Sequence, residues 1–362
     1  MKLATLALVA LVALPACATI PEPPGGETGL PNAGAGPFRA LVLGEIGNSR
    51  SAPNALTDSH GFARDVAVVD LDGDPSTYAV AGFVAAAVKE GEVEPDRDSP
   101  TRAIVRHGAL DGRSFDRAAE VVLTPDAAWE GGVVSGPAVV RVDGDLWLYY
   151  AAAGGIGLAR GDAQGTTFTK TAGPVLAPAE GGWEAGAAPR SPGVVRLADE
   201  SFRLFYEVPL PGGGSAIGEA RSDDGLTFER LGDAPALAPA PGATDPDEPP
   251  YDGAAVGGPF PILADSGAGE PILRVYYGAV DGEGKRTIGL AARYGAGGPL
   301  KRAVAPVFGT GKPLQPSEPC VVTWKGFSLL FATEQSSNSS KDPAIAAALA
   351  PATAALPPTD PK

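Results

Sequence analysis

The chain has 362 residues, and 44% of them are hydrophobic although 49 are glycine and 37 are proline. A composition that combines turn formers with enough apolar residues to bury a core indicates many short strands rather than a disordered chain. The net charge is −15, from 43 acidic and 28 basic residues, which excludes a nucleic-acid partner through electrostatic repulsion.

The first predicted element is an apolar leader over residues 1–16. It carries one positive charge, at Lys2, and its apolar run is too short to span a membrane, so we predict a signal peptide. The leader runs into LPAC (14–17), which resembles the lipobox of bacterial lipoproteins. The resemblance implies cleavage before Cys17, palmitate-type lipid on its sulfur, and a membrane-anchored address in the outer membrane or at the cell surface. Ordinary cleavage beside an incidental cysteine is the alternative.

The segments at the two ends of the mature chain offer little to bury. Residues 17–37 are rich in proline and glycine and are predicted to be a tether. Residues 351–362 are rich in alanine and proline and are predicted to be a disordered tail. The second cysteine, Cys320, lies in an apolar run, and with Cys17 lipidated it has no disulfide partner, so we predict it in the core.

Between these ends, a unit of short strands is repeated five times along the chain. Each unit has an apolar first strand, an aromatic-rich second strand and a third strand, and four units have a fourth. The first strands are predicted at 64–73, 135–144, 190–199, 257–267 and 317–326. Repeated four-stranded units are typical of propellers. We therefore predict an all-β, five-bladed β-propeller over residues 38–350, with the first strand of each unit innermost.

The segment FRALVLGEI (38–46) belongs to none of the five units and is predicted to be a strand. The fifth unit ends after its third strand, so we expect this segment to supply the missing fourth strand. Closing the ring in this way removes an exposed sheet edge that could pair with other chains.

The order of motifs within the units is similar to that of a known class of propellers. A P-x-V-V strand is followed by an aromatic Y-Y strand, and the best single match is AIGEARSDDGLTFERLGDAPALAP (216–239). The pattern resembles the five-bladed propellers of the arabinanase, levansucrase and invertase type, which include glycoside hydrolase families 43 and 32. The resemblance implies that a sugar binds over one end of the central channel, among acids at the starts of the innermost strands.

The residue before the proline of each first strand, or at the equivalent place, decides which acids the channel can hold. These five residues are Asp65, Gly136, Ser191, Gly258 and Glu318. Cleavage of a glycosidic bond needs two carboxyl groups. Because ring closure makes the first and fifth blades neighbours, we predict that Asp65 and Glu318 converge as a carboxylate pair. The family places its glutamate in a middle blade, and the three blades without an acid here depart from its three-acid pattern.

A second acid series lies one loop earlier, where an acid follows an aromatic residue seven or eight positions before the proline. The pairs are Trp129-Glu130, Trp183-Glu184 and Tyr251-Asp252. They could line a sugar subsite, since aromatic rings stack on sugar faces and carboxylates accept hydrogen bonds from hydroxyls. Alternatively, the aromatic residue packs between blades and the acid caps a turn. Repetition at equivalent places favours this structural alternative, because one ligand lacks the symmetry of the ring.

Three further residues lie just before inner strands. His60 could be an acid, a base or a sugar ligand, or a solvated loop residue. Arg64 and Arg190 could neutralise Asp65 or Glu318, or bind a carboxylated or phosphorylated sugar. With two histidines and no cysteine cluster, no transition-metal site and no other cofactor is expected. A calcium ion in the channel would suit acids near the axis.

Two functions remain open at this point. One is a monomeric, lipid-anchored propeller of the cell envelope that binds a glycan or an envelope protein without catalysis. The other is a glycoside hydrolase that acts on a cell-surface or extracellular polysaccharide, with Asp65 and Glu318 as its carboxylate pair. Carboxyl groups that face one open pocket within about 10 Å would favour the enzyme. A closed channel mouth, or an arginine paired with each acid, would favour the scaffold.

Overall fold

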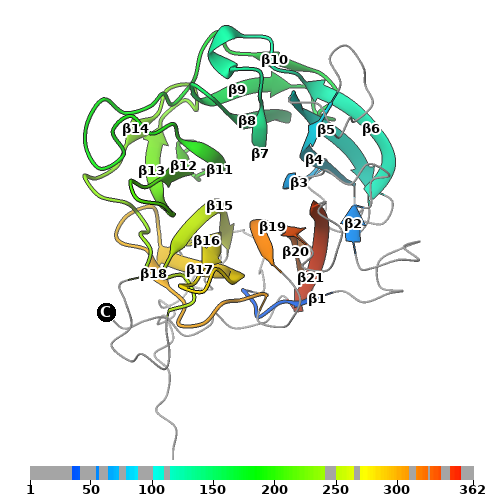
Figure 1. Ribbon diagram of the computed structural model, residues 1–362. Helices are drawn as coiled ribbons and strands as arrows, with labels where there is room; N and C mark the ends of the chain where they lie inside the picture. The colour runs from blue at the N-terminus through cyan, green and yellow to red at the C-terminus, as the bar shows by residue number, and fades with distance from the viewer. Residues whose placement is uncertain are drawn as a thin grey trace, which may run out of the picture.

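The computed structural model shows a ring of antiparallel β-sheets around a central axis (Figure 1). It describes residues 35–40, 54–56, 64–72, 79–88, 101–109, 115–240, 250–264, 270–309, 315–324, 327–335 and 343–351. Within these residues there are five sheets and one short 3-10 helix, Ala128–Glu130. The predicted all-β, five-bladed propeller is confirmed.

Each blade is one sheet with its strands in chain order. Blade one contains β3 (Arg64–Asp70), β4 (Val80–Ala87), β5 (Arg102–Ala109) and β6 (Phe115–Leu123). Blade two contains β7 (Ser135–Val142), β8 (Asp145–Ala152), β9 (Gly155–Gly161) and β10 (Phe168–Lys170). Blade three contains β11 (Arg190–Arg196), β12 (Phe202–Pro209), β13 (Ser215–Ser222) and β14 (Glu229–Arg230). Blade four contains β15 (Ala255–Ala264), β16 (Ile272–Val280), β17 (Arg286–Tyr294) and β18 (Lys301–Arg302).

Blade five combines strands from both ends of the described chain. It contains β19 (Pro316–Trp324), β20 (Phe327–Gln335) and β21 (Pro343–Pro351), and β21 also pairs with β1 (Arg39–Ala40) and β2 (Asn54–Leu56). The five first strands, β3, β7, β11, β15 and β19, contact one another in sequence around the axis (Figure 1). The predicted innermost position of the first strand is therefore confirmed in every blade.

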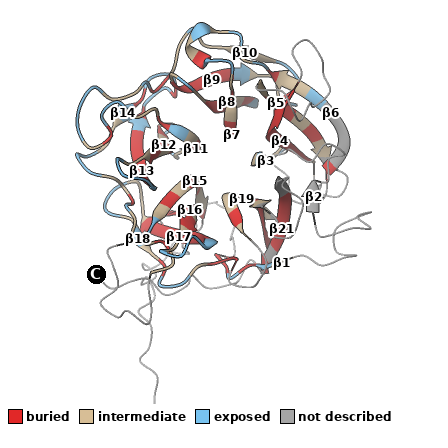
Figure 2. Cartoon of the chain, in the orientation of Figure 1, coloured by how far each residue is buried: buried red, intermediate tan, exposed pale blue. Residues whose placement is uncertain are grey.

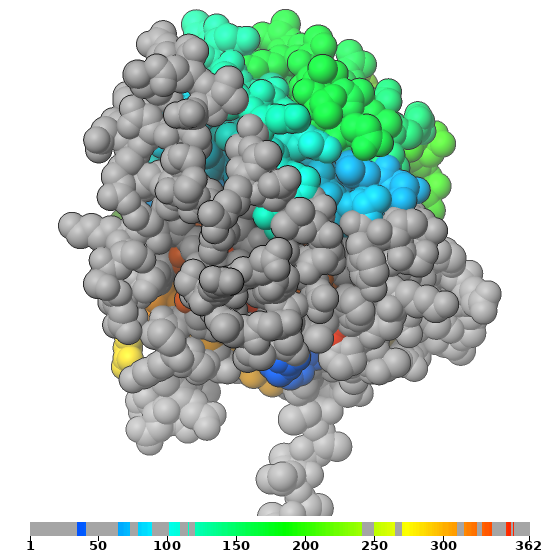
Figure 3. Space-filling model, turned by 90° about the vertical axis from the view of Figure 1, so that its right-hand side faces the viewer, coloured from blue at the N-terminus to red at the C-terminus, as the bar shows by residue number. Residues whose placement is uncertain are grey.

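The ring is closed by the segment next to the tether. β1 pairs antiparallel with β21, and Arg39 and Ala40 lie opposite Leu349 and Ala348. In the space-filling view, the blue atoms of residues 35–40 lie beside orange and red atoms from the C-terminal part of the chain (Figure 3). This confirms the predicted closing strand, of which residues 41–46 lie outside the described residues.

Aromatic side chains of the second strands fill the space between blades, as expected. Five tyrosines and three phenylalanines are fully buried, in the red strand interiors of Figure 2. They are Tyr149, Tyr150, Tyr206, Tyr276, Tyr277, Phe83, Phe205 and Phe331. Burial of each ring contributes about 2–3 kcal/mol to folding. Cys320 is a free, fully buried cysteine in the core between blades five and one, as predicted.

The leader, Cys17, most of the tether and the C-terminal tail lie outside the described residues, so the signal peptide and the lipid anchor stay predictions. In the part of the chain that the structure describes, no helix has the length and apolar character needed to cross a membrane.

Candidate site at the hub of the propeller

The same backbone irregularity occurs at the start of every inner strand. In each blade, the pairing of the first and second strands shifts register around one residue, which has a left-handed backbone. The values of φ are 53° at Asp65, 54° at Gly136, 45° at Ser191, 53° at Gly258 and 52° at Glu318. In four blades a proline follows, and proline has no N–H to donate, so the ladder is interrupted and the strand bulges.

This conformation explains why glycine holds two of the five places. Gly136 and Gly258 adopt positive φ without steric cost, whereas Asp65, Ser191 and Glu318 adopt it at a cost on the order of 1 kcal/mol each. The five places are the same ones that decide which acids reach the channel. The backbone conformation forms without a side chain at this position, so the side chains of Asp65, Ser191 and Glu318 are not required for the bulge.

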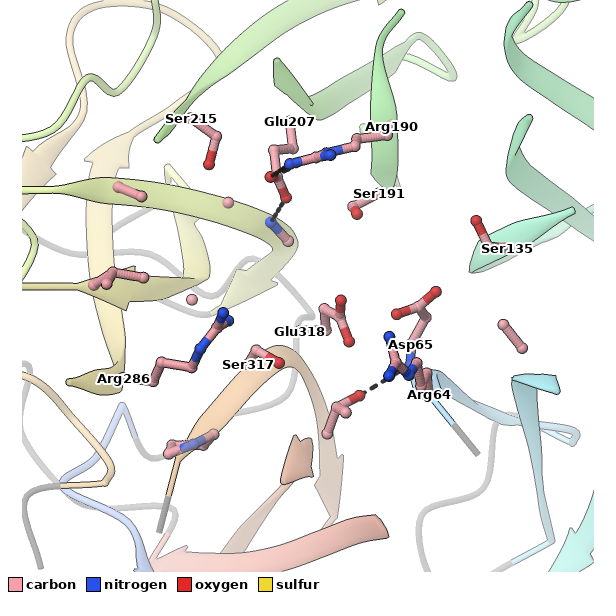
Figure 4. A pocket seen from close by; sticks show the side chains of 18 of the residues that line it. Arg64, Asp65, Ser135, Arg190, Ser191, Glu207, Ser215, Arg286, Ser317 and Glu318 are labelled. Atoms are coloured by element: carbon pink, nitrogen blue, oxygen red, sulfur yellow. Dashed lines mark hydrogen bonds and ion pairs between the residues drawn. The ribbon is translucent and has the colours of Figure 1, made fainter. Parts of the chain in front are cut away.

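A cavity of about 590 Å³ lies where the inner strands begin (Figure 4). Its walls come from the starts of first strands, the ends of second strands and the starts of third strands. Small residues leave the space open, among them Ser135, Ser191, Gly257, Gly258 and Gly278. The charged residues that line it are Asp65, Glu207, Glu318, Arg64, Arg102, Arg190 and Arg286.

Asp65 and Glu318 meet in this cavity from neighbouring inner strands, as ring closure predicts (Figure 4). Burial raises the pKa of Glu318 well above its usual range, and the charge of Asp65 and a hydrogen bond between the two carboxyl groups raise it further. The protonated form of Glu318 therefore persists to higher pH than that of an ordinary glutamate. Its Oε2 atom is buried and has no hydrogen-bond partner.

Asp65 also joins three blades. Its backbone N–H donates to the hydroxyl of Thr333 in blade five at 2.9 Å. Its Oδ2 atom accepts from the backbone N–H of Gly136 in blade two at 3.0 Å. The carboxylate is thus fixed on one side by the ring and faces Glu318 on the other. The proposed roles of the two acids in catalysis stay predictions.

Glu207, at the end of β12, is a third acid in the cavity. It pairs with Arg190 at 2.6 Å and accepts a hydrogen bond from the backbone N–H of Gly258 at 3.0 Å. A Cβ atom on Gly257 would lie 2.3 Å from its Oε2 atom, so the glycine makes room for the carboxylate.

From the sequence, Glu207 and Glu334 are acids at the ends of second strands and rank below Asp65 as candidates. The signal becomes visible once the strands are in register. The residues of the second strands at the place of Glu207 are Ala85, Ala151, Glu207, Gly278 and Thr333. Glu207 is the charged member of this set. Arg102 and Arg286 are likewise brought into the cavity by the starts of third strands.

The cavity arginines differ in their partners. One expected role of Arg190 is to neutralise Asp65 or Glu318, but its carboxylate partner is Glu207. Arg64, Arg102 and Arg286 have no ion pair among the described residues. Figure 4 shows Arg286 extending into the cavity from β17, with Arg64 on the opposite side of Glu318.

The three aromatic–acid pairs lie away from the cavity lining. Each acid is buried and is held by a tyrosine hydroxyl of the second strand and a cation of the fourth strand. Glu130 is 2.7 Å from the Tyr150 hydroxyl and 2.8 Å from the Lys170 ammonium. Glu184 is 3.0 Å from both the Tyr206 hydroxyl and the Arg230 guanidinium. Asp252 is 2.8 Å from the Tyr277 hydroxyl and 2.9 Å from the Arg302 guanidinium.

The aromatic members of these pairs also pack inside the blades. Trp129 stacks on Tyr150, Trp183 packs against the core between blades two and three, and Tyr251 hydrogen-bonds the Tyr277 hydroxyl at 2.8 Å. We call the repeated set of second-strand tyrosine, loop acid and fourth-strand cation the Tyr–acid–cation triad. Its repetition in blades two, three and four favours the structural alternative for these six residues.

The structure does not test two of the predicted residues. His60 and Cys17 lie outside the described residues. Within the described part of the chain, no group of three or more His, Cys, Asp or Glu side chains could hold a metal ion. A calcium ion in the channel stays a prediction.

No protein-family model and no curated protein matches the chain, but solved structures do. A structure titled glycoside hydrolase has a TM-score of 0.61 at 15% identity and covers 89% of this chain and 92% of its own. An endo-arabinase from Bacteroides thetaiotaomicron has a TM-score of 0.56 at 15% identity, with coverages of 83% and 97%. A thermostable family-43 glycoside hydrolase has a TM-score of 0.57 at 14% identity, with coverages of 83% and 92%.

These likenesses show the fold. The chain is a five-bladed propeller whose structural neighbours are glycoside hydrolase propellers, which confirms the resemblance seen in the sequence motifs. At 14–15% identity the neighbours carry no residue assignments to this chain, so the chemistry of the cavity is argued from its own side chains.

Proposed function

We propose that the cavity at the hub binds a glycan. The observation that carries this proposal is that equivalent positions in the five blades hold different side chains. Around the ring, the left-handed position holds Asp65 and Glu318 in two adjacent blades and only glycine or serine in the other three. Features that serve the fold repeat from blade to blade, as the Tyr–acid–cation triads do, whereas a single asymmetric ligand needs an asymmetric lining.

The size and chemistry of the cavity support this proposal. A volume of about 590 Å³ lies within the range of small-molecule sites, which is about 300–1,000 Å³. Carboxylates accept hydrogen bonds from sugar hydroxyls, and guanidinium groups and a protonated Glu318 donate them. The fold of the structural neighbours is compatible with a glycan at this place.

Glycoside hydrolysis is the second candidate function. A general acid requires a carboxyl group with a raised pKa, and burial and the neighbouring Asp65 raise the pKa of Glu318. No arginine pairs with Asp65 or Glu318 among the described residues. However, Glu207 is paired with Arg190, and three of the five left-handed positions hold glycine or serine, so the three-acid pattern that the resemblance implies is incomplete. We therefore rank binding first.

The leader supports a second part of the proposal. A lipid on Cys17 and the tether of residues 17–37 would hold the propeller at the outer membrane or the cell surface, where glycans are abundant. Mass spectrometry of the protein from its native membrane tests this part, because a lipidated Cys17 has a mass that an ordinary cleaved terminus lacks.

The binding proposal is tested by calorimetric titration of the purified protein with arabino-, xylo-, manno- and galacto-oligosaccharides, neutral and acidic. We expect at least one to bind, and Asp65→Asn to weaken it about tenfold through a lost charge-assisted hydrogen bond. Glu318→Gln should weaken it less, because the amide is the same size as the neutral carboxyl group and keeps a donor and an acceptor. Asp145→Asn is the matched control, because Asp145 is exposed and begins β8 at the far end of the blade.

Aryl glycosides added to the same proteins separate the two functions. Product release that is lost in Asp65→Asn and Glu318→Gln shows hydrolysis. Binding without product release shows a binding protein. If no oligosaccharide binds the wild-type protein and no aryl glycoside is cleaved, the proposed function is wrong.

A further inference from the structure

We infer that the glycan bound at the hub carries an anionic group, which the unpaired arginines of the cavity recognise. This inference rests on the proposed function and narrows its ligand class. It depends on three side chains, Arg64, Arg102 and Arg286, that line the cavity. Arg102 and Arg286 enter the cavity from strand starts that sequence motifs do not mark.

None of the three arginines forms an ion pair among the described residues. Several arginines elsewhere in the blades pair with acids. Arg293 contacts Glu219, Arg302 contacts Asp252 and Arg230 contacts Glu184. The chain has 43 acidic residues for 28 basic ones, so acidic partners are plentiful. Three cavity guanidiniums without an acid partner among the described residues are therefore unexpected on the basis of composition.

The charge of the cavity is opposite to that of the whole protein. Its described lining contains four arginines and three acids. Arg190 and Glu207 neutralise each other. The remaining three arginines outnumber Asp65 and Glu318 even when both acids are ionised, which gives a positive site in a protein of net charge −15. A site of this sign attracts an anion locally.

The arginines reach the cavity from different blades. Arg286 comes from blade four and Arg64 from blade one, and Glu318 of blade five lies between them (Figure 4). Guanidinium groups bind carboxylate, sulfate and phosphate oxygens through paired N–H donors, which a lysine could not do equally well. Burial and the neighbouring Asp65 raise the pKa of Glu318, which favours its neutral form, and a neutral carboxyl group does not repel an anion. The ligand class is therefore a sugar with a carboxylate, sulfate or phosphate substituent.

The test compares matched sugars that differ only in their charge. The probes are oligogalacturonate and its methyl ester, a sulfated galacto-oligosaccharide and its desulfated form, and mannose 6-phosphate and mannose. We expect at least one anionic probe to bind about tenfold or more tightly than its neutral partner, and the pair that shows this difference identifies the anionic group. Binding of that probe should weaken as salt concentration rises.

Arginine variants then test which side chains bind the anionic group. Arg64→Gln and Arg286→Gln should each weaken the anionic probe about tenfold and leave the neutral probe within about twofold. Both side chains are exposed, so the substitutions should not disturb folding, and equal melting temperatures confirm this. Arg221→Gln is the matched control, because Arg221 is an exposed arginine of β13 outside the cavity.

The outcomes separate this inference from the proposal on which it rests. If neutral probes bind as tightly as anionic ones, or if the two arginine variants bind the anionic probe like wild type, the inference is wrong while glycan binding stands. If none of these probes binds while an oligosaccharide of the binding test does, the inference is wrong and glycan binding stands. If nothing binds in either test, both are wrong.

Discussion

Glu318 combines two energetic costs at one residue. Its backbone has φ of 52°, which costs about 1 kcal/mol for a residue other than glycine, and its carboxyl group is buried beside that of Asp65. Glycine occupies the equivalent position in two blades, so the fold does not require a side chain there. A costly side chain that the fold does not require indicates a role in the function of the protein.

The raised pKa of Glu318 predicts a pH dependence of stability. Below about pH 4.5, its usual pKa, the carboxyl is protonated in both the folded and the unfolded chain. As pH rises above this value, the unfolded chain releases the proton while the folded chain retains it. This group's contribution to the free energy of unfolding therefore falls and is lost as pH passes the folded-state pKa. Glutamine is neutral and lacks this dependence.

Urea unfolding of wild type and Glu318→Gln between about pH 4 and pH 8 measures this effect. We expect the wild-type free energy of unfolding to decline relative to the variant as pH rises. Asp145→Asn serves as the control for removal of an exposed carboxylate. A constant difference between wild type and Glu318→Gln across the range would contradict a raised pKa in the folded state.

At the scale of the element, the Tyr–acid–cation triad ties the second strand, the preceding loop and the fourth strand of a blade together. In blade three, Glu184 accepts the Tyr206 hydroxyl and pairs with Arg230 of β14. Burial and the nearby carboxylate raise the pKa of Tyr206 above its usual range, so its hydroxyl stays a donor. β14 has two residues, and a side-chain anchor compensates for its few ladder bonds.

Removal of the acid from this triad should destabilise the protein without affecting ligand binding. We expect Glu184→Ala to lower the free energy of unfolding by about 2–3 kcal/mol, because Arg230 and the Tyr206 hydroxyl lose their buried partner. Tyr206→Phe should cost only about 1 kcal/mol. Chemical unfolding measures both. A loss of glycan affinity in Tyr206→Phe would instead support the subsite role for the aromatic–acid pairs.

The sequence is sufficient to predict the elements because they repeat. Apolar first strands and aromatic second strands recur at each blade, and a missing fourth strand points to the segment at 38–46. The site is predicted only in part, since its residues do not repeat. Glu318 is found because a proline motif marks its place, and Asp65 because it aligns with that place in the first unit. Glu207, Arg102 and Arg286 become neighbours only when separate blades meet around the axis.

At the scale of the whole molecule, the ring depends on a short segment at its seam. Phe38 is buried, its ring packs edge-on against Tyr276 of blade four at 5.9 Å, and its N–H donates to the carbonyl of Val307 at 2.7 Å. Together with the pairing of β1 and β21, this segment links blades four and five.

Truncation of this anchor should weaken the whole ring. We expect Phe38→Ala to lower the free energy of unfolding by about 3 kcal/mol, because a buried aromatic side chain is replaced by a cavity at the seam. Val304→Ala is the control, since Val304 is 51% exposed in the same blade-four region. Thermal and urea unfolding measure the difference. A Phe38→Ala protein as stable as the control would show that the seam does not hold the ring.

Neighbouring left-handed positions lie close together, and this closeness has a consequence in a ring with an odd number of blades. A Cβ on Gly136 would lie 3.1 Å from the Cα of Ser191, and one on Gly258 would lie 3.0 Å from the Cα of Glu318. At both junctions a glycine precedes a residue that has a side chain. Positions with and without a side chain therefore alternate in the order Asp65, Gly136, Ser191, Gly258, Glu318. Strict alternation cannot be completed around an odd-numbered ring. One junction must bring two side chains face to face, and it falls where the last blade meets the first, between Glu318 and Asp65.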